Sequence, residues 1–343
     1  MTAPAPFPAS TLARLQRALD GLVTCGGSPG GVIVCGTGTG ERDILAAGII
    51  APECGDAEPD AATRYDIASL TKVVATWPLG GQAWNLADLD RPVCEFLPLI
   101  AGPAPSGAAT IRQLLTHTAG LQPATRLDQY LGASTPLHEL ICAEPLDTPP
   151  GPHRYINRGF ILLGLALAHI NSTPLHELAA AYWDGLGMKD TTYGPVTRTS
   201  RVAPTEQVLA GAPRIWGGPH DQNAALMGGV AGHAGVFSTP ADLATYAEHL
   251  LTSHAAGSAD GDWLHRSMIA HVAIQPGASR GLAWVLTHDG MIAGHHGFTG
   301  TSLFLNPGNG RYIVICTNAV YHGRPGERLR PLRDLALQEI SIT

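Results

Sequence analysis

The sequence predicts an α+β fold in which an antiparallel sheet is flanked by helices from both ends of the chain and a helical domain is inserted between its strands. Three observations support this prediction. The chain has 343 residues, and 45% of them are hydrophobic. A chain of this length is longer than one hydrophobic core usually serves, which indicates two packed parts. Strand-like runs occur near both ends of the chain. Helical patterns separated by Pro/Gly loops dominate its middle.

The N-terminal part is expected to contain one helix and one β-hairpin. Four leucines at helical spacing give a helix over residues 11–22 one apolar face (Leu12, Leu15, Leu19 and Leu22). Two apolar runs, 32–35 and 44–50, flank a glycine-rich turn at 36–40. This pattern predicts a hairpin whose two strands are both largely buried.

The C-terminal part contains four further strand-like runs and a final helical segment over 325–340. Turn sequences such as Asp289-Gly290 separate the strands. A single sheet that joins these strands to the N-terminal hairpin is the most economical arrangement. The expected strand runs are 281–286, 291–294, 301–305 and 312–317.

The middle of the chain is expected to be a helical insertion, with helical runs such as 160–166. We therefore predict a discontinuous α/β domain formed by residues 1–87 and 236–343, and a mainly helical domain formed by residues 88–235. A cleft between the two domains is the natural place for an active site. The Gly- and Pro-rich segment 211–223 is either a wall or lid of that cleft or an ordinary surface loop.

Charge and composition exclude several classes of partner. Only 14% of the residues are charged, the formal net charge is -7, and no basic block is present, so neither nucleic acid nor a membrane surface is an expected partner. The most apolar run, 160–170, is far shorter than the ~20 residues that cross a bilayer. Residues 1–8 lack the basic and apolar regions of an export signal, so we expect a cytoplasmic protein.

No cofactor and no metal is expected. The six cysteines are widely spaced without a CxxC pair, and the 15 histidines contain no HExxH motif, so neither a zinc site nor a redox motif is indicated. The cysteines are expected to be small buried apolar residues. A metal site assembled from histidines far apart in the sequence stays open.

Ser69 and Lys72 form the most informative pair. They are three residues apart, so on a helix their side chains lie on one face within reach of each other. A serine hydroxyl is a weak nucleophile, but an amine made a better base by burial can accept its proton. Lys72 is also one of only two lysines in the chain, and arginine could not release a proton in its place. A chance pairing on an ordinary helix is the alternative.

Tyr155 and Asn157 form a second candidate pair, at the entry to the apolar run that starts at Phe160. A tyrosine hydroxyl near a serine and a lysine can relay a proton, and an asparagine amide can hold a substrate carbonyl or orient the lysine. Taken alone, a Tyr-x-Asn pair is weak evidence, because a tyrosine at a helix entry is an ordinary structural residue.

The third stretch, 294–301, lies on or beside a C-terminal strand and contains His295, His296 and Gly297. Glycines in a strand let a ligand approach the backbone closely, and an edge strand can present its N–H groups to a substrate carbonyl. Neighbouring side chains on a strand point to opposite faces, so at most one of the two histidines is expected to face the cleft. A tight bend with surface histidines is the alternative.

Together these motifs resemble those of the serine β-lactamase and penicillin-binding-protein superfamily, in its class C and carboxylesterase/transacylase branch. The order Ser69-x-x-Lys72, Tyr155-x-Asn157 and His295-His296-Gly297, interrupted by a helical insertion, carries the resemblance. It implies a β-lactamase-like fold. Further similar stretches lie at 110–121, 228–239 and 297–301.

The resemblance implies a role for each motif residue. Ser69 would be the acylated nucleophile, and Lys72 would be the base or its partner. Tyr155 would relay the proton, and Asn157 would bind the substrate through its amide. The oxyanion would lie between the N–H groups of Ser69 and Phe298.

The third motif differs from the Lys-Thr-Gly or His-Thr-Gly form that is usual in this superfamily. His295 replaces the lysine that faces a substrate carboxylate, and His296 replaces a hydroxyl residue. Gly297 and Phe298 complete this substrate-binding strand. A neutral imidazole is a poorer partner for a carboxylate than a permanent cation, which argues against efficient β-lactam hydrolysis.

The expected function is that of a serine acyl-transfer enzyme. A small ester or amide would acylate Ser69, and the acyl group would pass to water or to an amine or alcohol acceptor, as in transacylases of natural-product biosynthesis. The alternative is a β-lactamase or D-alanyl-D-alanine peptidase exported by another route. A non-catalytic binding or sensor module is the alternative of another class, against which intact Ser69, Lys72 and Tyr155 argue.

Overall fold

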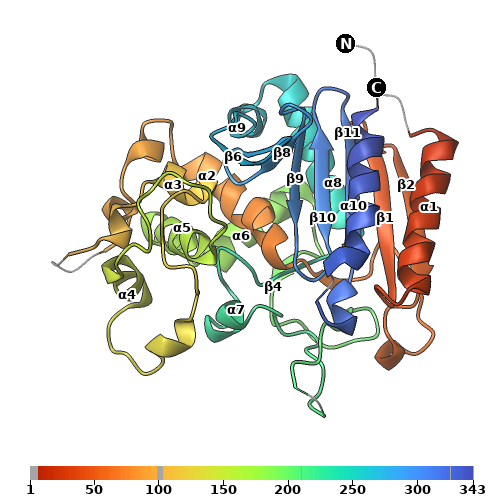
Figure 1. The fold of residues 1–343 in the computed structure, drawn as a ribbon, viewed down its shortest axis with the longest axis horizontal. Coiled ribbons are helices and arrows are strands. Elements are labelled where there is room, and N and C mark those ends of the chain that lie inside the picture. Colours follow the sequence, from red (N-terminus) through yellow and green to blue (C-terminus); the bar gives the residue numbers. More distant parts are fainter. Residues whose placement is uncertain (1–6, 99–102, 210, 325, 343) are drawn as a thin grey trace.

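The structure is a computed structural model that describes residues 7–98, 103–209, 211–324 and 326–342. An eight-stranded antiparallel sheet in the order β2-β1-β11-β10-β9-β8-β7-β6 forms its centre (Figure 1). The N-terminal hairpin therefore joins the C-terminal strands, as predicted. The strands are β1 (Gly30–Thr37), β2 (Arg42–Gly48), β6 (Val272–Gln275), β7 (Ala278–Arg280), β8 (Val285–Thr287), β9 (Ile292–His296), β10 (Ser302–Asn306) and β11 (Arg311–Thr317).

Helices from both ends of the chain cover one face of this sheet. The leucine stripe of α1 (Ala9–Thr24) and the apolar side of α10 (Gly326–Ser341) share a core with Ile33 of β1 and Ile313 of β11. Strand residues on the opposite face, such as Val34, belong to a second and larger core. Because α8 (Pro240–Ala256) contacts β1, β10 and β11, it covers that second face. The α+β architecture with flanking terminal helices is confirmed.

The middle of the chain is largely helical. The apolar helix α5 is buried along most of its length and contacts α2, α3, α4 and α6. A small sheet in the order β3-β5-β4 lies beside these helices. The predicted boundaries at 87/88 and 235/236 stay predictions. The remaining elements are α2 (Trp77–Ala83), α3 (Ile111–Thr116), α4 (Leu137–Ala143), α5 (Asn157–Ile170), α6 (Leu175–Leu186), α7 (Gln222–Leu226), α9 (Ala259–Ser267), β3 (Tyr65–Asp66), β4 (Thr192–Tyr193) and β5 (Val236–Ser238).

Two strand predictions are wrong in detail. β2 is not buried along its length, because it is the edge strand of the sheet and its residues alternate between exposed and half-buried. In the expected run 281–286 only the last two residues reach β8. Ala283 has a φ of 72° and its N–H donates to the Leu115 carbonyl, so this segment leaves the sheet and packs against α3. Its apolar residues are buried in a loop, which the sequence pattern does not distinguish from a strand.

No helix within the described ranges combines the length and the hydropathy needed to cross a membrane. Residues 1–6, on which the expectation about export depends, lie outside the described residues, as does Pro325, the expected start of the last helix.

Candidate active site

Ser69 and Lys72 lie in the connection between β3 and α2, on two successive turns of different geometry. Ser69 belongs to a short 3-10 turn, η2 (Ala68–Leu70), and Lys72 begins a π-helical turn, η3 (Lys72–Thr76). The expectation of one regular helix is therefore corrected. A π turn is widened relative to an α-helix and is common at functional sites.

The π turn is fixed by buried aromatic side chains. The Tyr246 hydroxyl donates to the Val73 carbonyl at 2.5 Å, and the Trp183 indole N–H donates to the Val74 carbonyl at 2.9 Å. Side chains from α8 and α6 thus satisfy carbonyl groups of this turn inside the core. This bonding holds the backbone that carries Lys72.

The Lys72 amine is completely buried and makes three hydrogen bonds to oxygen. Its Nζ lies 2.9 Å from Ser69 Oγ, 3.0 Å from Asn157 Oδ1 and 3.1 Å from the His233 carbonyl. A neutral amine has two hydrogens and one lone pair. If the hydrogens go to Asn157 and to the carbonyl, the lone pair points to the Ser69 hydroxyl, which is the arrangement needed to accept its proton.

Tyr155 lies beside this pair and faces the pocket. Its side chain is 43% exposed, and its ring centroid lies 4.9 Å from Lys72 Nζ. The buried imidazole of His117 packs against the same ring, with the two planes tilted by 36°. Within the described chain the Tyr155 hydroxyl makes no hydrogen bond, so it is available to a bound substrate. Proton relays often close only in the substrate complex.

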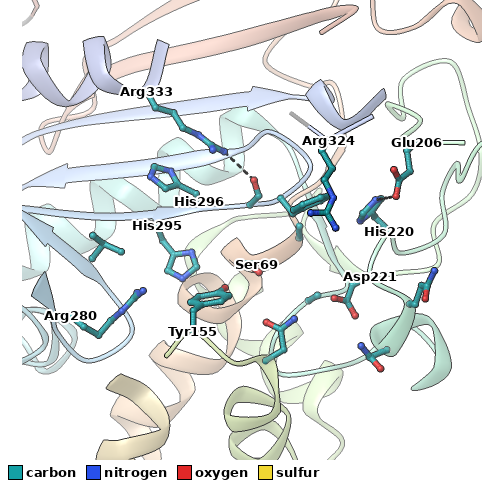
Figure 2. A pocket seen from close by; sticks show the side chains of 18 residues that line it. Ser69, Tyr155, Glu206, His220, Asp221, Arg280, His295, His296, Arg324 and Arg333 are labelled. Carbon is teal, nitrogen blue, oxygen red and sulfur yellow. Dashed lines mark hydrogen bonds and ion pairs between the residues drawn. The ribbon is translucent and has the colours of Figure 1, made fainter. Parts of the chain in front are cut away.

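The third motif lies at the end of β9, as Figure 2 shows. His295 points toward Tyr155, with 6.4 Å between the ring centroids, while His296 is directed toward Arg333 of α10. Their side chains do leave opposite faces of the strand. The expectation that at most one faces the cleft is wrong, however, because the pocket wraps around the strand end and both line it.

Gly297 is required by space rather than by backbone conformation. A Cβ atom at this position would lie 2.1 Å from Thr301 Oγ1 and 2.4 Å from the Ile67 carbonyl oxygen. The end of the strand therefore packs directly against Ile67, two residues before Ser69. Arg333 holds the same turn by donating to the Gly297 and Thr301 carbonyls, both at 3.1 Å.

The two histidines of the motif are neutral near pH 7. Burial, helped by the nearby charge of Arg280, lowers the pKa of His295 well below its ordinary value. Burial and the charges of Arg333 and Arg280 lower the pKa of His296 to about 3. His295 is 3% exposed, and neither of its ring nitrogens has a hydrogen-bond partner among the residues that the structure describes. An orphaned imidazole aimed at the pocket suits a hydrogen bond to a substrate.

Arg280 supplies a positive charge that the motif itself lacks, and the sequence patterns did not point to it. This side chain at the end of β7 is 3% exposed, and its Cζ lies 5.8 Å from the Tyr155 ring centroid. It donates to the Ala283 carbonyl and to His153 Nε2. Burial lowers the pKa of Arg280 to about 10, so the guanidinium remains charged at pH 7. In the sequence, the one sign that Arg280 belongs to the site is its position shortly before β9.

The pocket has a volume of about 660 Å³ and brings nearly all the predicted residues together (Figure 2). Lys72 lies beneath its floor. From the segment 211–223, only residues 220–223 line the pocket, whereas the Trp216 indole is turned to the Val202 carbonyl. The predicted residues in the lining are Ser69, Tyr155, Asn157, His295, His296, Gly297 and Phe298.

Further polar residues line the wall opposite β9; from the sequence, the segment 211–223 is a candidate cleft wall, but no role is assigned to its individual side chains. The ring of His220 stacks on Phe298, and its Nε2 lies 2.7 Å from Glu206 Oε1. Asp221 follows directly and bonds to His233. Across the described ranges, no three His, Cys, Asp or Glu side chains are grouped so as to hold a metal ion. The other lysine, Lys189, is exposed just after α6.

Fold and site together define a protein of the serine β-lactamase-like superfamily. The chain belongs to the beta-lactamase family, whose model matches residues 15–338. It is 27% identical over 303 residues to an Escherichia coli (strain K12) protein named "Putative D-alanyl-D-alanine carboxypeptidase", covering 75% of this chain and 69% of that one.

Solved structures with 21% and 19% sequence identity share the fold. The first, "EstCE1, a hydrolase with promiscuous acyltransferase activity", has a TM-score of 0.72, and the match covers 94% of this chain and 98% of that one. The second, simvastatin synthase (LovD) from Aspergillus terreus in a mutant form, also has a TM-score of 0.72, with 97% of this chain and 95% of that one covered. These structures show the fold, and the family model, which matches residues 15–338, confirms the resemblance seen in the motifs.

Proposed function

We propose that this protein is a serine acyl-transfer enzyme that takes an acyl group from a small ester or amide onto Ser69. The 2.9 Å between Lys72 Nζ and Ser69 Oγ carries the proposal, because it sets a base within hydrogen-bond distance of the nucleophile. As Ser69 Oγ bonds to the substrate carbonyl carbon, its proton passes to Lys72. The carbonyl π electrons move to the oxygen, which becomes an oxyanion.

The N–H groups of Ser69 and Phe298 are the proposed oxyanion donors. In the described part of the chain, the Phe298 N–H donates to no protein acceptor. The fit of Gly297 against the Ile67 carbonyl fixes the distance between the strand end and the nucleophile turn. Two backbone donors held in this way stabilise charge without rearranging during the reaction.

Tyr155 is the proposed proton relay to the leaving group. When the carbonyl re-forms, the bond to the leaving oxygen or nitrogen breaks, and that atom takes up the proton that Lys72 received, by way of the Tyr155 hydroxyl. The acyl group then passes from Ser69 to water, or to an amine or alcohol that enters the same pocket. Action in the cytoplasm stays a prediction, which fractionation of cells producing the chain would test.

A second candidate is a peptidase acting on a peptide that ends in a free carboxylate. The buried Arg280 guanidinium in the pocket favours it, because it can bind a carboxylate where His295 cannot. The name of the Escherichia coli relative points the same way.

Intact-mass analysis separates these functions. Wild type and Ser69→Ala are incubated with p-nitrophenyl acetate, with a penicillin, and with a peptide ending in D-alanyl-D-alanine. We expect an acetyl adduct on wild type alone. Release of D-alanine in preference to ester turnover would favour the peptidase, and fast nitrocefin turnover would favour a β-lactamase. If wild type shows neither an adduct nor turnover, the result would favour a non-catalytic binding or sensor module.

A further inference from the structure

Asp221 and His233 have no part in the chemistry proposed above, yet they are hydrogen-bonded to its centre. His233 is fully buried, and its Nε2 lies 2.9 Å from Asp221 Oδ1. The backbone carbonyl of the same histidine accepts the hydrogen bond from Lys72 Nζ at 3.1 Å. One residue therefore connects the proposed base to a carboxylate in the pocket wall.

The charges of this pair are settled by its surroundings. Burial lowers the pKa of His233, although the Asp221 carboxylate opposes this, so the imidazole is neutral near pH 7. Burial raises the pKa of Asp221, but the hydrogen bonds from His233 and from the Ala224 N–H outweigh burial, and the pKa lies below its ordinary value. His233 Nε2–H thus donates to an ionised carboxylate, which makes a strong hydrogen bond.

The backbone just before His233 is held tightly by its neighbours. A Cβ atom at Gly232 would lie 2.1 Å from the Phe160 carbonyl oxygen, so the chain passes in close contact with α5. The Thr76 hydroxyl donates to the Gly232 carbonyl at 2.6 Å from the same π turn that carries Lys72. The bridge between Ala231 and Ala234 closes the turn that contains the His233 carbonyl, and the His233 side chain adds the hydrogen bond to Asp221.

Asp221 is itself tied to the nucleophile turn. The N–H of its neighbour His220 donates to the buried Asp66 carboxylate at 2.7 Å, and the other oxygen of Asp66 accepts the Ala68 N–H at 2.8 Å. Asp221 also accepts the Ala224 N–H at the start of α7. Hydrogen bonds and short peptide links thus form a closed ring around the proposed nucleophile and base.

We propose that Asp221 and His233 are a positioning pair, which holds the His233 carbonyl against Lys72 and thereby keeps the Lys72 lone pair on Ser69 Oγ. The inference rests on the proposed function. If the imidazole loses its carboxylate, the carbonyl shifts, the amine turns away, and proton transfer from Ser69 slows. A misplacement of about 1 Å can slow an enzyme about 100-fold.

The test measures the rate constant for acetylation of Ser69 by p-nitrophenyl acetate, together with the fraction of protein that becomes acetylated. The variants are Asp221→Asn, which keeps the size and the helix cap, His233→Gln, which keeps an N–H donor near the position of Nε2, and His233→Leu, which keeps no donor. We expect the rate constant to fall at least about tenfold in His233→Leu, which removes the hydrogen bond. Asp221→Asn and His233→Gln, in which a weaker, uncharged hydrogen bond can still form, should lie between His233→Leu and wild type.

A structural role alone would lower the acetylated fraction and the melting temperature, whereas a positioning role lowers the rate at an unchanged final fraction. The matched control is His249→Gln, because His249 Nε2 also bonds to an aspartate, Asp260, at 2.7 Å, but away from the pocket. Its rate should equal that of wild type.

Three outcomes would overturn the inference. A rate within twofold of wild type in His233→Leu would do so, as would a loss of acetylated fraction without a change in rate. If wild type itself forms no adduct on Ser69, the proposed function fails and the inference fails with it. An adduct on wild type with unchanged variant rates refutes only the inference.

Discussion

The imidazole of His117 lies 4.4 Å from the phenol ring of Tyr155, measured between ring centroids. The same imidazole accepts the Ile156 N–H on Nδ1 at 3.3 Å, and the His117 carbonyl accepts the Arg154 N–H at 2.8 Å. Burial and the nearby cations lower the pKa of His117 well below its ordinary value, so the ring is neutral and can accept that bond. His117 therefore fixes both the ring and the backbone of the proposed proton relay.

The His117→Asn variant should slow ester turnover about tenfold without abolishing it. Asparagine tolerates the left-handed φ of 57° at this position, but it removes the ring on which Tyr155 rests. Initial rates with p-nitrophenyl acetate measure the effect. A rate equal to that of wild type would show that the ring contact does not position Tyr155.

Replacement of Lys72 by alanine should lose at least as much activity as Tyr155→Phe, because without a base the Ser69 hydroxyl stays a weak nucleophile. General-base catalysis contributes about 10²–10⁴-fold, so losses of that order are expected in kcat/KM. Lys72→Arg should be equally impaired, since arginine does not release its proton.

Lys189→Ala is the matched control for these variants. It removes the only other lysine of the chain, which is exposed and outside the pocket, and should leave kcat/KM unchanged. Near-normal turnover in Lys72→Ala would mean that another group is the base.

The Arg280→Gln variant should raise KM for donors that carry a carboxylate more than about tenfold, because a charge-assisted hydrogen bond is lost. Neutral esters make no such bond, so their kcat/KM should change little. Steady-state kinetics with a matched pair of esters, one with and one without a terminal carboxylate, measures the difference. Equal changes in KM for the two esters would show that Arg280 only supports the loop at Ala283 and the side chain of His153.

The free energy of unfolding should fall as pH drops from 7 toward 5, and His295 should contribute to that fall. The unfolded chain has an ordinary histidine pKa near 6.5, whereas burial holds the folded pKa well below it. Below pH 6.5 the unfolded state therefore binds a proton that the folded state does not, and above pH 6.5 the contribution is fully present. Urea denaturation at several pH values should show a shallower dependence in His295→Asn. The control variant is His176→Asn, which replaces an exposed histidine, and its free energy of unfolding should depend on pH as that of wild type does.

Gly297→Ala should both destabilise the protein and slow acylation. The added methyl group meets the Thr301 hydroxyl and the Ile67 carbonyl, and overpacking of this kind costs about 1–3 kcal/mol. The strand end must also move away from the nucleophile turn. Chemical denaturation and the acetylation rate measure the two effects, and a variant that is destabilised yet acetylates normally would separate packing from catalysis.

Much of the fold could be predicted from the sequence because apolar periodicity reports burial. The leucines of α1 and the strand runs of β9, β10 and β11 were found to within a few residues. The run 281–286 was mistaken because a buried loop and a buried strand have the same apolar pattern. The segment from Ser69 to Lys72 is expected to be one α-helix because spacing alone does not distinguish an α-helix from a 3-10 turn followed by a π turn.

The motif residues of the candidate site could be predicted because their chemistry depends on residue type and local spacing. Arg280, Asp221 and His233 could not, since each acts through a partner far away in the sequence. The distance from His233 to Lys72 is 161 residues along the chain but 3.1 Å in space. Such contacts depend on tertiary packing, which one sequence does not display.

The burial of Lys72 leaves Lys189 as the single solvent-facing lysine of the chain. A reagent that modifies primary amines therefore meets one accessible side chain, on the connection after α6 and outside the pocket. A fluorophore or a solid support can be attached there without touching the candidate active site. The scarcity of lysine thus leaves one accessible side-chain amine for labelling, beside the α-amino group, which such a reagent also modifies.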